Sequence, residues 1–266
     1  MTKPITFVGD SHGDASWLTM VMRAAQEAGS NRLVQLGDFG LWPGRSGEAF
    51  LDEVARALEH YDMELLFIDG NHDWHELRLQ FQPEEDGLVT VRPRLRYAPR
   101  GTGFELVPGV RALAIGGAPS IDRGYRVQGV SWWPEETITY AEMKQCIKVG
   151  RVDIVLAHDA PIEPRLHDLA PWEPGDAHRK LMSEIWNSAR PRWWLSAHYH
   201  QRISEQVSRN GFTTRFEILD CNLSGENGLG WMIVDNEALL LAGNDPIISP
   251  PTGQLTKRIS IKKRVE

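Results

Sequence analysis

The chain has 266 residues, of which 41% are hydrophobic, so it is long enough to bury a core and too apolar to be intrinsically disordered. Its net charge of −7 argues against sequence-independent binding to long nucleic acids, which depends on neutralising many phosphates. Cys146 and Cys221 form no metal or redox motif, and no apolar run is long enough for a signal peptide or a membrane span, so we expect a cytoplasmic protein without membrane contact.

The first part of the chain alternates between strands and helices. Short apolar runs predict strands at 5–8, 33–36 and 65–68. Apolar residues at helical spacing predict helices at 15–28, with Gly29 as the stop signal, and at 48–60. This alternating order indicates a mainly parallel sheet with helices packed outside it.

The rest of the chain is richer in strands. Turn residues separate predicted strands at 88–91, 95–98, 104–107, 110–115, 154–157, 193–196, 203–207, 215–219, 231–234 and 239–241. Helices are expected at 139–149, where Thr139 and Glu142 have the spacing of a capping box, and at 176–187. Residues 116–136 form a long loop rich in Gly, Arg and Trp.

Five of the predicted strands are each followed at once by residues that can bind metals. They are Asp10 and His12 after the first strand, Asp38 after the second, Asn71 and His72 after the third, and His158, His198 and His200 after two later ones. Open α/β folds place their sites at the carboxyl ends of their strands. We therefore expect these residues to gather at one edge of the sheet.

Each of these residues has an ordinary explanation when it is taken alone. Asp10 could cap a helix, Asn71 could form a turn, and a histidine after a strand is usually a hydrogen-bonded surface residue. Together, however, carboxylate, imidazole and amide ligands at one edge suit Mn²⁺, Fe or Zn²⁺ better than Ca²⁺ or Cu.

The series Asp-x-His, Gly-Asp, Gly-Asn-His-Asp, His and His-x-His, in that order from Asp10 to His200, resembles that of the calcineurin-like metallophosphoesterases. The resemblance implies an α/β fold of two packed β-sheets that are flanked by helices on both outer faces. It also implies a catalytic domain, at residues 1–243, which leaves a Pro-containing, basic C-terminal tail at 244–266. We expect this tail to be solvated, the alternative being a contact with nucleic acid or a second subunit.

The resemblance further implies two divalent metal ions, with Mn²⁺ favoured and Fe, Zn²⁺ or Ni²⁺ as alternatives. By motif position, Asp10, His12 and His200 would bind the first ion, Asn71, His158 and His198 would bind the second, and Asp38 would bridge them. A hydroxide shared by the two ions would attack phosphorus, and His72 would protonate the leaving oxygen as general acid. The alternative for His72 is a purely supporting role beside Asn71.

The chain departs from the family pattern after the second predicted strand. Many members read Gly-Asp-x-x-Asp-Arg-Gly there, but this chain has Leu41 and Trp42 in place of the Asp and the Arg. The usual carboxylate partner of His72 and the usual phosphate-binding arginine are therefore both missing. Ala157 and Ala197 also replace glycines, which is a small steric change.

Candidate substrate contacts lie in the loop 116–136 and between two motif histidines. Arg123 or Arg126 could replace the missing phosphate contact, although either one alone is more simply a solvated arginine. Trp132 and Trp133 could stack on a base, the alternative being loop packing. Tyr199 could face the substrate or the core. Three histidines have no motif position and are expected at the surface: His75, His167 and His178.

The leading hypothesis is a phosphodiesterase acting on small phosphodiesters or nucleotides. Within the family the chain looks most like small phage and bacterial members, some of which act on 2′,3′-cyclic nucleotides. A phosphomonoesterase, including a protein phosphatase, is the runner-up. A nuclease ranks third because only the basic tail supports it. A non-catalytic scaffold ranks last because the chain retains all eight residues expected as metal ligands or as the acid histidine. The sequence makes no prediction of oligomeric state.

Overall fold

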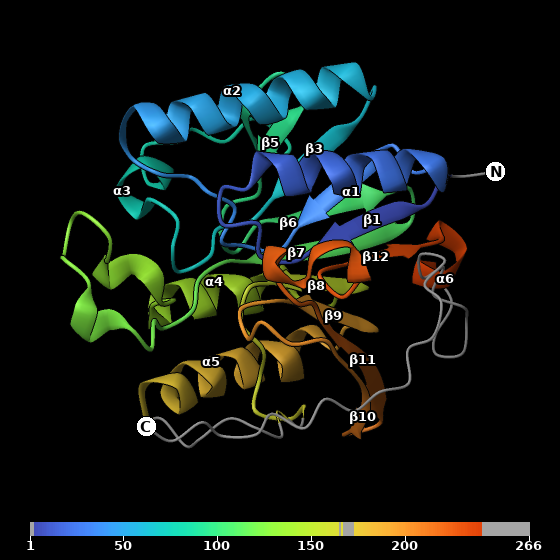
Figure 1. The fold of residues 1–266 in the computed structure, drawn as a ribbon. Coiled ribbons are helices and arrows are strands. Elements are labelled where there is room, and N and C mark those ends of the chain that lie inside the picture. The colour runs from blue at the N-terminus through green and yellow to red at the C-terminus, as the bar shows by residue number, and fades with distance from the viewer. Residues whose placement is uncertain (1–2, 165, 167–172, 241–266) are drawn as a thin grey trace, which may run out of the picture.

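A computed structural model describes residues 3–164, 166 and 173–240, and its strands form two six-stranded sheets (Figure 1). The first sheet has the strand order β12 (Trp231–Val234), β1 (Ile5–Val8), β2 (Arg32–Gln35), β3 (Glu64–Phe67), β5 (Leu95–Tyr97) and β4 (Val89–Arg92). The second has the order β10 (Ile203–Arg209), β11 (Phe212–Ile218), β9 (Trp193–Ser196), β8 (Ile154–Ala157), β7 (Val110–Ile115) and β6 (Gly103–Val107). In each sheet the central strands run parallel and both edge strands are antiparallel to their neighbours.

Helices cover the outer face of each sheet. Figure 1 shows α1 (Ala15–Glu27) and α2 (Gly44–His60) over the first sheet, with α4 (Tyr140–Val149) and α5 (Glu173–Ala189) over the second. Shorter helical segments lie in the connections: α3 (His75–Arg78), α6 (Asn236–Leu240), η1 (Arg123–Tyr125), η2 (Pro134–Glu136) and η3 (Asn222–Asn227). The predicted fold of two packed sheets between outer helices is confirmed.

Three apolar layers hold these elements together. Along β1, Phe7 belongs to the cluster between the two sheets, while Val8 belongs to the cluster under α1 and α2. Along β8, Leu156 faces the first sheet and Val155 faces α4 and α5. Successive side chains of a strand point to opposite faces, so the central strands are buried on both sides. This explains why they read as continuous apolar runs in the sequence.

Most predicted elements are present, with shifted ends. The helix predicted at 48–60 begins earlier, at Gly44, and the one predicted at 176–187 extends over Glu173–Ala189. The capping box is also present: the Glu142 N–H donates to Thr139 Oγ1 over 3.1 Å, and the Thr139 N–H donates to the Glu142 carboxylate over 2.7 Å.

The strand predicted at 239–241 is wrong. Its first two residues belong to α6, and Leu241 lies outside the described residues. Leu239 is fully buried and packs with Ala238 in the layer between the sheets. A short apolar run does not by itself distinguish a buried strand from a helical turn. The expected domain end at residue 243 and the tail at 244–266 also lie outside the described residues.

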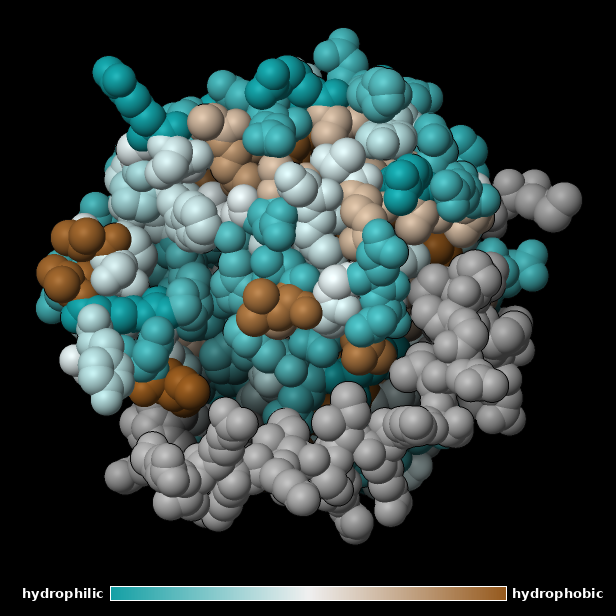
Figure 2. Space-filling model, in the orientation of Figure 1, coloured by the Kyte–Doolittle hydropathy of each residue, from teal (hydrophilic) through white to brown (hydrophobic). Residues whose placement is uncertain are grey.

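One face of the molecule is largely polar (Figure 2). Figure 2 shows this face as mostly hydrophilic, with hydrophobic side chains in separate small groups, including some where Figure 1 places the loop 116–136. That loop exposes Ile121, Tyr125, Val127 and Val130. Within the described part of the chain, no helix has the length and apolar character needed to cross a membrane.

Candidate metal centre

The carboxyl ends of central strands from both sheets bring the predicted ligands together. The loops after β1, β2 and β3 carry Asp10, His12, Asp38 and Asn71, and the loops after β8 and β9 carry His158, His198 and His200. Contacts across the two sheets join these loops: His158 Nε2 lies 3.5 Å from Asp38 Oδ1, and His200 Nε2 lies 3.0 Å from Asp10 Oδ2. The centre therefore needs both sheets.

Asp10, His12 and His200 form one compact group. Each offers one possible ligand atom, and these atoms lie within 4.8 Å of one another. Asp10 is fully buried, and its second carboxylate oxygen accepts a 3.1 Å hydrogen bond from the main-chain N–H of His198. These three residues are the set predicted for the first ion.

Asp38 lies between the two predicted ligand sets. Its Oδ2 is 3.5 Å from His12 Nε2, while its Oδ1 is 3.5 Å from His158 Nε2. Asp10, Asp38 and His158 form a second compact group of possible ligand atoms. A carboxylate with one oxygen directed to each side fits the bridging position that the sequence predicts.

The contact between His158 and Asn71 fits a proton or a cation shared by the two side chains. His158 Nδ1 lies 2.8 Å from the Leu36 carbonyl oxygen, which can only accept, so Nδ1 carries a hydrogen. His158 Nε2 then lies 3.0 Å from Asn71 Oδ1, which is also an acceptor. Two acceptors this close need a proton or a cation between them. The donor set therefore fits a metal ion at the predicted second site.

His198 is less closely engaged than the other predicted ligands. Its ring centroid lies 5.0 Å from that of His158, but among the described residues its nitrogens join neither compact group. Its role as a ligand stays a prediction.

Strained backbone marks the same residues. His12, Asp38, His198 and His200 have φ values of 44°, 52°, 69° and 49°, in the left-handed region that residues other than glycine rarely adopt. Such conformations persist where the surrounding structure enforces them, and they concentrate at functional sites. Four of the eight such residues in the described chain lie in these loops, and the other four, Asp62, Arg94, Arg190 and Asn210, lie elsewhere.

The electrostatics of the centre favour cations. Burial lowers the pKa of His158, but Asp38 and Asp10 outweigh burial and raise it to about 10. The hydrogen bond to Asp10 likewise raises the pKa of His200 to about 10. Burial acts to raise the pKa of Asp38, yet the nearby His158 and His72 hold it well below its usual range. The buried carboxylates require positive charge, which protons or divalent ions can supply.

Asp73 ties the loop after β2 to the loop after β3. Its fully buried carboxylate accepts hydrogen bonds from the main-chain N–H groups of Phe39 (3.2 Å), Gly40 (3.0 Å), Leu41 (2.9 Å) and Gly70 (2.8 Å). Burial and the neighbouring Asp38 charge raise the pKa of Asp73 to about 6, although these hydrogen bonds oppose the rise. Sequence reasoning assigned Asp73 no role of its own, even though its place in Gly-Asn-His-Asp was a usable signal.

His72 lies at the exposed side of the centre. Its main-chain N–H donates to Asp38 Oδ1 over 2.7 Å, and its side chain is 35% exposed. The ring contacts the guanidinium of Arg126, whose Nε also donates to Asp122 Oδ2 over 2.8 Å. Burial lowers the pKa of His72, Asp38 opposes this, and Arg126 lowers it further. Of the two candidate arginines, Arg126 is the one that the structure brings to His72.

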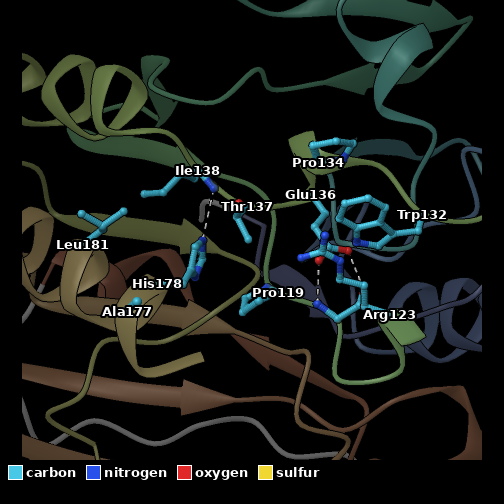
Figure 3. Close-up of a pocket in the computed structure, with 11 residues that line it drawn as sticks. Pro119, Arg123, Trp132, Pro134, Glu136, Thr137, Ile138, Ala177, His178 and Leu181 are labelled. Carbon is cyan, nitrogen blue, oxygen red and sulfur yellow. Dashed lines mark hydrogen bonds between the residues drawn. The ribbon is translucent and has the colours of Figure 1, made fainter. Parts of the chain in front are cut away.

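A cavity of about 550 Å³ lies beside the centre, between the loop 116–136 and α5 (Figure 3). One wall is formed by Ala177, His178 and Leu181, and another by Arg123, Trp132 and Pro134. None of its lining residues in the described chain is a predicted metal ligand. Its link to the centre is Ser120, which lines the cavity and accepts a hydrogen bond from Asn71.

The two candidate stacking residues are already engaged within the protein. The Arg123 guanidinium lies over the Trp132 ring, 4.1 Å from its centroid, so one face of the indole is covered. Trp133 is 3% exposed and its ring packs against His75. Loop packing, the alternative to base stacking, therefore describes Trp133.

Tyr199 and two histidines expected at the surface belong to buried networks. The Tyr199 hydroxyl donates to the Asp159 carboxylate, and His178 Nδ1 donates to the other Asp159 oxygen over 2.6 Å. Tyr199 thus directs its hydroxyl to the core. His75 is fully buried, with its Nδ1 accepting from Arg78 Nε over 3.1 Å. The surface prediction is wrong for His75 and His178, which are 0% and 3% exposed. His167 lies outside the described residues.

One known protein family matches most of the chain. The sequence profile of the family described as "Calcineurin-like phosphoesterase" matches residues 3–202, and no curated protein sequence matches the chain. The crystal structure of TT1561 from Thermus thermophilus has a TM-score of 0.58 at 15% identity, covering 90% of this chain and 96% of that one.

Two further structures are more distant. A novel archaeal phosphodiesterase has a TM-score of 0.43 at 12% identity, covering 88% of this chain and 94% of that one. A putative 5′-nucleotidase from Staphylococcus aureus has a TM-score of 0.49 at 12% identity, covering 97% of this chain and 56% of that one. At such identities a likeness shows the fold alone, and these two scores are too low to support any conclusion.

Proposed function

Because the chain belongs to the calcineurin-like phosphoesterase family, we propose that it is a phosphodiesterase for small phosphodiesters, including 2′,3′-cyclic nucleotides. Two divalent cations, when bound, would supply activated water and neutralise charge on the phosphate. We favour Mn²⁺, because imidazoles outnumber carboxylates among the proposed ligands, and Mg²⁺ prefers an all-oxygen environment. Fe, Zn²⁺ and Ni²⁺ are the alternatives.

The loop after β2 is the observation that carries the preference for a diester. Leu41 is fully buried, and Trp42 packs so closely on Gly13 that a Cβ there would lie 2.6 Å from Trp42 Cη2. The apolar ring of Trp42 thus lies beside Gly13, the residue after His12. Many family members have a phosphate-binding arginine at the position of Trp42. A phosphate monoester is largely dianionic at neutral pH, while a diester carries one charge. Without this arginine, the site favours the monoanion.

The residues of the centre would divide the remaining tasks. Asp10, Asp38 and the imidazoles would hold the cations and, through them, the phosphate. His72 would give a proton to the leaving oxygen, because its ring is partly exposed beside Asp38 and its main chain is fixed by that carboxylate.

The test compares kcat/KM for bis-p-nitrophenyl phosphate, 2′,3′-cyclic AMP and p-nitrophenyl phosphate in Mn²⁺. We expect both diesters to be better substrates than the monoester. A Trp42→Arg variant, which restores the family residue, should shift the ratio toward the monoester. A wild-type enzyme that prefers the monoester would rule out the diester proposal.

The contact between Arg126 and His72 favours a second candidate, a phosphomonoesterase. A guanidinium there could bind an additional phosphate charge, although one of its N–H groups already donates to Asp122. Under this alternative, Arg126→Met should lower kcat/KM for the monoester far more than for the diester. Arg123→Met is the matched control, since Arg123 stacks on Trp132. Equal losses on both substrates in Arg126→Met would speak against the alternative.

A further inference from the structure

The side-chain amide of Asn71 must face a definite way to serve the second cation. Its Oδ1 lies toward His158 Nε2, at 3.0 Å, and its Nδ2 donates to Ser120 Oγ over 2.9 Å. The two ends of an amide have nearly the same shape, so shape alone does not choose between the two orientations. The choice depends on the hydrogen bonds at the other end.

Ser120 and Glu136 make that choice. Ser120 Oγ donates to Glu136 Oε2 over 2.6 Å, and the Ser120 main-chain N–H donates to Glu136 Oε1 over 2.9 Å. Because the hydroxyl of Ser120 donates to Glu136, its single proton is already used. The hydroxyl can then only accept from Asn71. Asn71 must therefore present its NH₂ to Ser120 and its carbonyl oxygen to the cation site.

This chain of hydrogen bonds is buried. Asn71, Ser120 and Glu136 are 1%, 2% and 3% exposed. Little of these side chains is exposed to solvent, and reversing the amide would set its oxygen against the lone pairs of Ser120. An unsatisfied buried polar group costs about 1–3 kcal/mol. The preference for one amide orientation is correspondingly strong.

Hydrogen bonds also connect Glu136 to the segment after β3, which carries Asn71. Arg100 donates to the main-chain carbonyls of Glu136 and Thr137 over 3.1 and 3.0 Å. The same guanidinium pairs with the buried carboxylate of Asp69 over 2.7 Å. Asp69 lies two residues before Asn71. Arg100 therefore connects the end of the loop 116–136 to the segment that carries Asn71.

We propose that Ser120 and Glu136 are positioning residues that present the amide oxygen of Asn71 to the second cation and so set the affinity of that site. The inference rests on the proposed pair of cations, but not on the proposed substrate. Neither residue is among the predicted ligands. Both belong to the loop 116–136, which thus orients a metal ligand without supplying one.

The test measures Mn²⁺ binding to the full-length protein by calorimetry, with electron paramagnetic resonance to distinguish a coupled Mn²⁺ pair from a single ion. Ser120→Ala should weaken one of the two binding steps about 10–100-fold, the range found when partners of metal ligands are removed. It should also replace the coupled spectrum by that of one ion at limiting Mn²⁺. Ser120→Thr keeps the hydroxyl and should retain both sites.

A second variant tests the direction of the hydrogen bonds. In Glu136→Gln the new NH₂ can donate to Ser120, which frees the hydroxyl to donate toward Asn71 and permits the reversed amide. We expect the same weakened step as in Ser120→Ala. Ser183→Ala is the matched control: its hydroxyl donates to the Glu163 carboxylate over 2.6 Å, away from the centre, and its loss should leave both sites unchanged.

The outcomes separate this inference from the function on which it rests. If Ser120→Ala and Glu136→Gln both bind two Mn²⁺ ions as tightly as wild type, while Asn71→Ala loses one, the positioning role is wrong and the ligand set stands. If Asn71→Ala also keeps two tight sites, Asn71 is not a ligand, and both the positioning role and the proposed ligand set are wrong. Should Ser120→Ala not fold, Glu136→Gln and Ser120→Thr still decide the question.

Discussion

Asp38 contacts both halves of the metal centre. One of its oxygens faces His12 and the other faces His158, in a nearly solvent-free environment. A residue in this position would affect both proposed cations at once. The neighbouring His72, by contrast, should affect the chemistry and not the binding of metals.

Replacing Asp38 by alanine should abolish activity and prevent stable binding of two cations, because the carboxylate that lies between the two predicted ligand sets is gone. Elemental analysis after gel filtration should find fewer than two metals per chain, with an unchanged circular dichroism spectrum. Asp62→Ala, at a side chain 85% exposed, is the control. Two tightly held metals in folded Asp38→Ala would disprove the bridging role.

Replacing His72 by alanine should affect substrates according to their leaving group. A p-nitrophenolate leaves without a proton, whereas a ribose alkoxide needs one. We therefore expect a loss of roughly 10²–10⁴-fold on 2′,3′-cyclic AMP, the usual contribution of general acid catalysis, and a much smaller loss on bis-p-nitrophenyl phosphate. Similar losses on the two substrates would identify His72 as a supporting residue only.

At the scale of elements, the central strands and the residues at their ends could be predicted from the sequence. A strand buried on both faces is a continuous apolar run, and the polar residues that follow it, such as Asp10 and Asn71, stand out for that reason. The loop 116–136 has no such pattern. Ser120 and Glu136 acquire their positions through contacts with Asn71 and Arg100, which are distant in sequence. Likewise, the apolar run at Leu239 fits a helical turn as well as a strand.

The loops after β2 and β3 depend on Asp73 for their relative position. Asp73→Ala should lower the free energy of unfolding by about 3 kcal/mol or more, because it leaves several buried N–H groups without an acceptor. Urea denaturation should be followed with a chelator present, so that loss of metal does not contribute. Asp86→Ala, which removes an exposed pair with Arg96, should change stability by less than about 1 kcal/mol. A similar small change in Asp73→Ala would show that the loops hold their positions without it.

At the scale of the whole molecule, the metal centre joins two separate sheets. Removal of the cations by chelation should lower the melting temperature, since a ligand that binds only the folded state adds about 2.7 kcal/mol at a concentration of 100 Kd. Mn²⁺ should restore the melting temperature and the activity better than Mg²⁺, as expected for a site rich in imidazole. Scanning calorimetry at matched free-ion concentrations provides the measurement. Equal restoration by Mg²⁺ would contradict the proposed ligands.

The pairing of β12 with β1 bears on how the protein is made. β1 is the first of the described strands to leave the ribosome, yet its neighbour on one side, Trp231–Val234, is among the last of the described segments to be synthesised. Until then one edge of β1 stays open, and an open strand edge can pair with other chains. The residues that would complete the cation sites, His158, His198 and His200, also emerge late. Loading of the proposed pair of metals would therefore follow translation of most of the chain, and truncated chains should tend to aggregate.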